Sequence, residues 1–176
     1  MMAAIRPRAA QRMRVAAAAF MIRIMIGLLQ RVSAAAVAVD DVVIAGIDRG
    51  LLVLVGVEAG DGRAQADRLL ERVLGYRVFP DAAGRMNLSL RDVAGGLLLV
   101  PQFTLAADTG KGTRPGFSYA ASPEVGRALF DYLVARAAAA HPRVACGSFG
   151  SHMQVTLTND GPVTFWLRAA PSLPAC

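Results

Sequence analysis

The feature that most constrains the fold is the change of hydrophobic period along the chain. Short apolar runs bounded by turn residues, such as RGLLVLVGVE at 49–58, are typical of strands. Two stretches, within 61–79 and 122–140, instead place apolar residues at helical spacing. This pattern predicts the α+β class, as an antiparallel β-sheet or partial barrel with two covering helices.

The first strands are expected to follow one another closely. The runs at 28–39 and 42–47 are separated by Asp40-Asp41, and GLLVLVGVE at 50–58 begins at the turn Asp48-Arg49-Gly50. Such short connections predict a meander of three strands. The long apolar run GGLLLVPQFTLAA at 95–107 is typical of a strand that is buried on both faces.

The two helices carry different signals. The first has a single apolar face, which is formed by Ala66, Leu69, Leu70, Val73 and Leu74. The second has a start signal, because Ser122 can accept hydrogen bonds as an N-cap and Pro123 suits the first helical position.

Charge is distributed unevenly along the 176 residues. The formal net charge of +6 owes most to the first 24 residues, which contain no acid and hold Arg6, Arg8, Arg12, Arg14 and Arg23. The remaining chain is nearly neutral, so any RNA contact would depend on a local patch. Lys111 and Arg114, in the loop TGKGTRP, are candidates for binding phosphate.

One domain is expected, spanning residues 25–168, between an N-terminal extension (1–24) and a C-terminal tail (169–176). We interpret the extension as disordered or as the product of an upstream start. A signal peptide is the alternative, although Arg23 interrupts its apolar run. Cys146 and Cys176 form no paired framework, which favours a reducing, cytoplasmic location without a membrane partner.

The segment NDGPVT at 159–164 leaves two possibilities open. Asp160-Gly161 between strand-like runs is a strong signal for a tight hairpin. The other possibility is a cis bond between Gly161 and Pro162, which occurs in about 5% of X-Pro bonds.

The sequence offers few groups for side-chain catalysis. His141 and His152 lack the spacing of metal ligands, and neither a P-loop nor a dinucleotide fingerprint is present, so we expect no metal and no cofactor. Cys146 could act as a nucleophile with His152, which would make the protein a hydrolase of small esters, but a strand cysteine is more often a packing residue.

Several motifs, in order along the chain, resemble those of the D-aminoacyl-tRNA deacylase family. They are QRVSAAAVAV, RGLLVLVGVE, RMNLSLRDV, PQFTLAADTGKGTRPGF, FGSHMQVTL and NDGPVTFWL, collinear from about Met25 to Leu167. The resemblance implies a proofreading hydrolase that cleaves the ester between tRNA and a D-amino acid or mischarged glycine. A non-catalytic RNA-binding module of the same fold is the alternative.

The resemblance also implies a catalytic set. Gln102, Phe103 and Thr104 would form the hydrolytic pocket, with the Phe103 amide as an oxyanion donor. The Thr104 hydroxyl would either act as the nucleophile or orient a water, and we favour attack by water assisted by the ribose 2′-hydroxyl of the substrate. Gly161 and Pro162 of one subunit of a homodimer would reach, with a cis bond, into the active site of the other subunit. Their carbonyl oxygens would hold the substrate α-amino group, so that an L side chain collides with the loop.

Further residues are assigned by the same resemblance. Phe149 and Met153 would line the adenosine pocket, and Arg31 would brace the Gly-Pro loop. The chain departs from the family pattern at three positions, where serine, a basic residue and serine are common: Pro101, Gly110 and Gly116.

Overall fold

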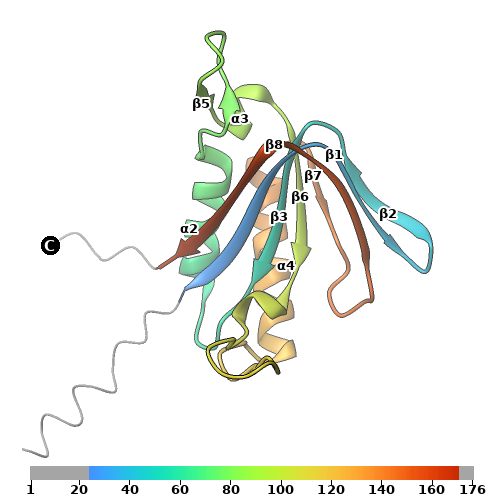
Figure 1. The fold of residues 1–176 in the computed structure, drawn as a ribbon, viewed down its shortest axis with the longest axis vertical. Helices are drawn as coiled ribbons and strands as arrows, with labels where there is room; N and C mark the ends of the chain where they lie inside the picture. The colour runs from blue at the N-terminus through green and yellow to red at the C-terminus, as the bar shows by residue number, and fades with distance from the viewer. Residues whose placement is uncertain (1–23, 171–176) are drawn as a thin grey trace, which may run out of the picture.

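The computed structural model describes residues 24–170, in which a curved sheet is covered on one side by helices (Figure 1). The main sheet contains β1 (Met25–Val39), β2 (Val42–Ile47), β3 (Gly50–Gly56), β6 (Gly96–Pro101), β7 (Val144–Cys146) and β8 (Gln154–Ala169). A separate small hairpin is formed by β4 (Phe79–Pro80) and β5 (Met86–Leu88). The helical elements are α2 (Arg63–Gly75), α3 (Leu90–Val93), the 3-10 helix η1 (Phe103–Ala106) and α4 (Pro123–Ala140).

Strand β1 organises the sheet because it is long enough to pair with three strands. Its residues 26–32 pair with β3 and its residues 35–39 pair with β2, whereas β8 pairs with both halves of β1. The predicted meander is therefore wrong. Asp48 and Arg49 bend the chain without reversing it, so β2 and β3 follow one another along the same edge of β1.

The sheet is mixed. β1 is antiparallel to β2, β3 and β8, but β6 runs parallel to β3 and β7 runs parallel to β6. The α+β class with a partial barrel and two long covering helices is confirmed, while the sheet is not antiparallel throughout. The parallel pairs arise because α2 and α4 provide the crossover connections before β6 and β7.

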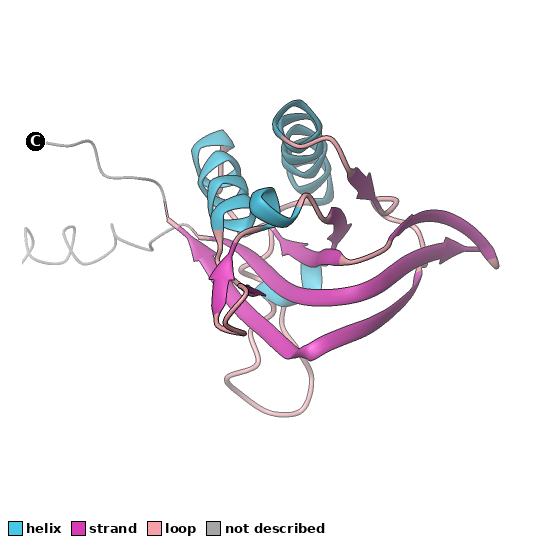
Figure 2. Cartoon of the chain, turned by 90° about the horizontal axis from the view of Figure 1, so that it is seen from above, coloured by secondary structure: helices cyan, strands magenta, loops and turns pink. Residues whose placement is uncertain are grey.

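Two apolar clusters lie on opposite faces of the sheet. Leu97 and Leu99 of β6 pack in the larger cluster beneath α2 and α4. Leu98 and Val100 point the other way, into a second cluster enclosed by the curved strands. Figure 2 shows both long helices on one side of the strands. The prediction that β6 is buried on both faces is confirmed, although the strand ends at Pro101 and Phe103–Ala106 forms η1 instead.

The helix signals have their expected structural effects. The apolar face predicted for α2 is buried, and Ser122 accepts a hydrogen bond from the Val125 amide with Pro123 at the start of α4. Across the two helices, Asp67 accepts hydrogen bonds from the Tyr132 hydroxyl at 3.0 Å and from Arg136 Nε at 3.0 Å.

The proposed extension and tail lie almost entirely outside the described residues, apart from Ile24, Ala169 and Ala170. Ile24 is buried and Ala169 belongs to β8. Within residues 24–170, the structure contains no helix whose length and hydropathy would let it cross a membrane.

Candidate active site

The segment NDGPVT lies within β8 and is not a hairpin. Thr164 pairs with Gln30 of β1, and Asn159 pairs with Val32, so the four residues 160–163 face Arg31 alone. The strand keeps its direction and the extra residues form a bulge. The peptide bond between Gly161 and Pro162 is cis, and both residues are exposed.

The Asn159 side chain closes this bulge. Its Oδ1 accepts a hydrogen bond from the Val163 amide at 2.7 Å, and its Nδ2 donates to the Val163 carbonyl at 3.3 Å. Nδ2 also lies within hydrogen-bonding distance of Thr164 Oγ1, at 3.1 Å, and of Gln30 Oε1, at 3.2 Å. No role of its own was assigned to Asn159 within NDGPVT from the sequence. The available signal was the tendency of asparagine to hydrogen-bond to nearby backbone groups.

Arg31 braces the same loop from β1. It is buried, and its Nε donates to the Asp160 carbonyl at 2.8 Å and forms an ion pair with Asp160 Oδ2 at 3.1 Å. Its Nη1 donates to the Val78 carbonyl at 2.6 Å. Arg31 therefore joins the base of the Gly-Pro loop to the segment that follows α2.

Gln102, Phe103 and Thr104 lie where β6 turns into η1. The Gln102 amide donates to the Val55 carbonyl at 2.7 Å, and the first bond of η1 runs from the Leu105 amide to the Gln102 carbonyl at 3.2 Å. The amides of Phe103 and Thr104 precede that bond, as the first amides of a helix do. Gln102 Nε2 donates to the Thr104 hydroxyl oxygen at 2.6 Å.

A cavity of about 460 Å³ opens beside these residues. It brings Gln102 and Phe103 together with Phe149 and Met153, which are distant in sequence. His152 also lines the cavity, a position that its isolation in the sequence did not predict. The volume lies within the range of small-molecule sites, and the wall is largely aromatic and apolar.

Other predicted residues lie away from this cavity. Lys111 and Arg114 are exposed on the loop that follows η1 and do not line it. That loop is closed by two backbone bonds between Asp108 and Gly116, at 2.8 and 2.9 Å. Gly110 also belongs to it, and its amide donates to Asp108 Oδ1 at 2.9 Å.

Pro101 and the two histidines have distinct surroundings. Pro101 ends β6 opposite Val55 and lines the cavity. The position where this chain has proline in place of the family's common serine is therefore part of the cavity wall. His141 is buried at the end of α4, with Nε2 2.7 Å from the Gly95 carbonyl oxygen. His141 is therefore held by a buried hydrogen bond away from the cavity, whereas His152 lines the cavity.

Cys146 is poorly placed for a nucleophile. It is half-buried in β7 and does not line the cavity of Gln102 and Phe103. Burial, together with the nearby Asp131 carboxylate, raises the pKa of the Cys146 thiol. A raised pKa reduces the fraction of thiolate, which is the reactive form.

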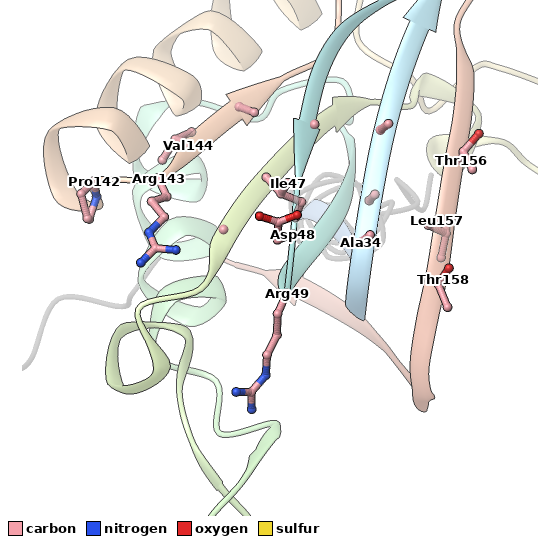
Figure 3. A pocket seen from close by; sticks show the side chains of 15 residues that line it. Ala34, Ile47, Asp48, Arg49, Pro142, Arg143, Val144, Thr156, Leu157 and Thr158 are labelled. Carbon is pink, nitrogen blue, oxygen red and sulfur yellow. The ribbon is translucent and has the colours of Figure 1, made fainter.

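A larger cavity, of about 600 Å³, is lined by β1, β2, β7 and β8 residues (Figure 3). Small side chains at 34–36 contribute to its wall, and Arg49 and Arg143 also line it. None of the residues predicted for the active site lines this cavity.

The Gly-Pro loop and the Gln102 cavity are separated within one chain. The loop faces Arg31, which pairs with Leu51 at the beginning of β3, whereas Gln102 bonds to Val55 near the end of that strand. Four residues along a strand correspond to about 13 Å. Neither cavity has Gly161 or Pro162 in its lining.

Comparison with known proteins identifies close relatives. The sequence profile of the D-Tyr-tRNA(Tyr) deacylase family matches residues 28–168. The D-aminoacyl-tRNA deacylase of Thioalkalivibrio sulfidiphilus is 65% identical over 147 residues, which cover 84% of this chain and 99% of the relative. That of Nitrosococcus oceani is 63% identical over 149 residues, covering 85% and 96%.

Two solved structures share the fold. The c-Myc DNA unwinding element binding protein superposes with a TM-score of 0.78 at 32% identity, covering 85% of this chain and 99% of that one. A probable eukaryotic D-amino acid tRNA deacylase superposes with a TM-score of 0.74 over 82% of this chain and 99% of that one. At 18% identity, the second likeness concerns the fold alone.

Proposed function

This chain belongs to the D-aminoacyl-tRNA deacylase family, and on that premise we propose that it hydrolyses the ester bond between a D-amino acid and tRNA. The family resemblance drawn from the motifs is thereby confirmed. The observation that carries the proposal is the meeting of Gln102 and Phe103 with Phe149 and Met153 around one cavity. Water attacks the ester carbonyl, and the products are a free amino acid and a tRNA with its terminal hydroxyl restored.

The cavity suits the terminal adenosine of the tRNA. Phe149 offers an aromatic face for stacking a base, a contact worth about 1–3 kcal/mol per base in nucleic-acid complexes. Met153 supplies a polarizable side chain that adapts to a flat ligand. With the adenosine there, the ester would lie at the mouth of the cavity, beside η1.

The amide of Phe103 is the proposed oxyanion donor. It stands at the start of η1, ahead of the first helical hydrogen bond, so it is available to a ligand. A backbone donor aimed at a developing oxyanion contributes about 10²–10³ in rate. This assignment requires no charged side chain.

Thr104 is proposed to orient the substrate and not to attack it. Its hydroxyl oxygen accepts a hydrogen bond from Gln102 Nε2, and this side-chain amide nitrogen cannot act as the base that takes the hydroxyl proton. The 2′-hydroxyl of the terminal ribose lies next to the ester within the substrate itself. We assign the activation of water to that hydroxyl.

A paired experiment tests this assignment. Thr104→Ala should retain measurable deacylation of D-Tyr-tRNA, because the nucleophile is water. D-Tyr-tRNA ending in 2′-deoxyadenosine should be hydrolysed at least about a hundredfold more slowly, within the range of general acid–base catalysis. An inactive Thr104→Ala variant with normal hydrolysis of the deoxy substrate would make Thr104 the nucleophile.

A homodimer would bring the separated parts of the site together. The Gly-Pro loop of one subunit would enter the cavity mouth of its partner and place the Gly161 and Pro162 backbone against the substrate α-amino group. The exposure of both residues, and their distance from Gln102 in one chain, support this arrangement. Exposed aromatic side chains beside η1 offer contact area for the partner: Phe103, Phe117 and Tyr119.

Selection of the D form would then follow from exclusion. An L side chain would point at the partner's loop, whereas a D side chain, or the hydrogen of glycine, would point away. Mischarged glycyl-tRNA would be a second substrate, and the enzyme would proofread both in the cytoplasm.

The direct test is deacylation of D-Tyr-tRNA, L-Tyr-tRNA and Gly-tRNA by the purified protein. We expect turnover of the D-tyrosyl and glycyl substrates and none of the L-tyrosyl substrate. Binding of D-Tyr-tRNA without turnover would favour the alternative, a non-catalytic RNA-binding module. Hydrolysis of both tyrosyl enantiomers at similar rates would contradict the proposed exclusion by the loop.

A further inference from the structure

Phe149 is attached to helix α4 on several sides. Its ring centroid lies 6.3 Å from that of Phe130, and it also faces Gly126. The guanidinium carbon of Arg127 lies 4.9 Å from the Phe149 ring centroid. Arg127 Nη2 also donates a hydrogen bond to the Phe149 carbonyl, at 3.0 Å.

The residues around Phe149 form a short turn, which is closed by hydrogen bonds between Ser148 and Ser151. The hydroxyls of Ser148 and Ser151 lie 2.7 Å apart, and the Ser151 amide donates to the Ser148 carbonyl at 3.3 Å. Phe149, Gly150 and Ser151 all line the cavity. A displacement of this turn relative to α4 would therefore move the cavity wall.

Arginine is well suited to hold this turn. A planar guanidinium can stack on an aromatic ring and donate an in-plane hydrogen bond at the same time, whereas a lysine ammonium lacks the planar geometry. Arg127 directs both contacts at Phe149: its guanidinium lies over the ring and donates to the carbonyl of the same residue.

We propose that Arg127 is a positioning residue, which holds Phe149 at the geometry needed to stack the terminal adenine of the substrate. The inference rests on the proposed function, because it assigns the cavity to that adenine. It adds a residue that acts through Phe149, with no contact to the reacting atoms. Misplacement of a binding group by about 1 Å is costly in enzymes, so the contact matters although it lies on the surface.

The first test separates KM from kcat for D-Tyr-tRNA. Arg127→Ala should raise KM about tenfold and leave kcat unchanged, since one cation–π contact and one hydrogen bond are lost. Arg127→Lys keeps a cation above the ring, so its KM should lie between those of the wild type and Arg127→Ala. In a Phe149→Leu background, Arg127→Ala should have little further effect, because the residue through which it acts is gone.

Arg136→Ala is the matched control. It removes one arginine from the exposed side of the same helix, where Arg136 contacts Asp67 and not the cavity. Its KM should equal that of the wild type. If Arg127→Ala raises KM equally in the Phe149→Leu background, Arg127 acts on the RNA as a charge and the proposal fails.

A second measurement is independent of activity. Hydrogen exchange of the Ser151 amide, which donates to the Ser148 carbonyl, should become at least about tenfold faster in Arg127→Ala than in the wild type, and remain unchanged in Arg136→Ala. Unchanged exchange in Arg127→Ala would overturn the proposal. If exchange is faster in Arg127→Ala but the wild-type protein does not deacylate D-Tyr-tRNA, the positioning role stands and the proposed function is rejected.

Discussion

At the scale of single residues, the Gly-Pro loop depends on polar side chains that surround it. Arg31 and Asn159 supply hydrogen bonds to the backbone of the loop from its two sides, one from β1 and the other from within β8. These contacts fix where Gly161 and Pro162 are presented. Their loss should therefore affect the reaction more than it affects the fold.

Asn159→Ala tests this expectation. The change removes the hydrogen bonds to the Val163 amide and carbonyl and should lower the free energy of unfolding by about 1–3 kcal/mol. Deacylation of D-Tyr-tRNA should fall by at least an order of magnitude, because the bulge loses its closure. Urea unfolding measures the free energy change, and an initial-rate assay measures deacylation.

Asn159→Asp is the control for that change. It keeps the acceptor for the Val163 amide and loses the donor to the Val163 carbonyl, so its activity should lie between those of the alanine variant and the wild type. Wild-type activity in Asn159→Ala would show that the loop holds its shape without this side chain.

Cys146→Ala should leave deacylation unchanged. The thiol lies outside the cavity, and burial raises its pKa, so it carries little thiolate at neutral pH. The variant and the wild type are compared in the initial-rate assay, before and after treatment with iodoacetamide. Loss of activity in both the variant and the alkylated wild type would return the thiol-dependent hydrolase to consideration.

Single residues also show what the sequence predicted and what it did not. Gln102, Phe103, Phe149 and Met153 were predicted from the family resemblance, and the structure places them around one cavity. The contact of Arg127 with Phe149 was not predicted, because the two residues are 22 positions apart and only packing brings α4 against the 148–151 turn.

At the scale of elements, hydrophobic period predicted which segments form strands and helices, but not how the strands pair. The runs at 42–47 and 50–56 have the spacing of a meander, yet both strands lie along one edge of β1. NDGPVT has the composition of a hairpin, yet it continues as one strand because β1 offers a pairing edge on both sides of the bulge. Pairing is decided by partners that no local pattern specifies.

The contact between β3 and β6 can be tested in the same terms. Gly50 pairs with Gly96 in the parallel ladder, and a Cβ on Gly50 would lie 2.0 Å from the Gly96 carbonyl oxygen. Gly50→Ala should destabilise the protein by at least the ~1–3 kcal/mol typical of overpacking, because the obstacle is backbone and cannot rotate away. Urea unfolding measures the change.

Gly75→Ala provides the comparison for that variant. Gly75 ends α2, and a Cβ there would meet no atom within 4 Å. The free energy of unfolding of Gly75→Ala should be the same as that of the wild type or higher by up to about 1 kcal/mol. Equal stability of the Gly50 and Gly75 variants would contradict the close approach of the two strands.

At the scale of the whole molecule, the two parts of the proposed site lie at different ends of β3. The Gly-Pro loop lies across β1 from the beginning of that strand, and the Gln102 cavity lies at its end. Whether a second subunit joins them is a question that sequence periodicity could not address, and the resemblance alone raised it. Two variants that damage different parts of the site can answer it.

Gly161→Ala damages the loop, and Phe149→Ala damages the cavity. Gly161 has φ of +149°, and an added Cβ would lie 2.7 Å from the Val163 amide nitrogen, so the loop must change shape. Phe149 contributes its ring to the cavity wall. Each variant alone should have little deacylase activity, and each should form a dimer with the mass of the wild type.

Mixing the two variants under conditions that exchange subunits gives the decisive result. A heterodimer contains one site with an intact cavity from the Gly161→Ala subunit and an intact loop from the Phe149→Ala subunit. Random exchange makes half of the dimers mixed, so activity should recover to about a quarter of the wild-type value. If both parts of the site came from the same subunit, every site in the mixture would carry one defect, and the activity would not recover.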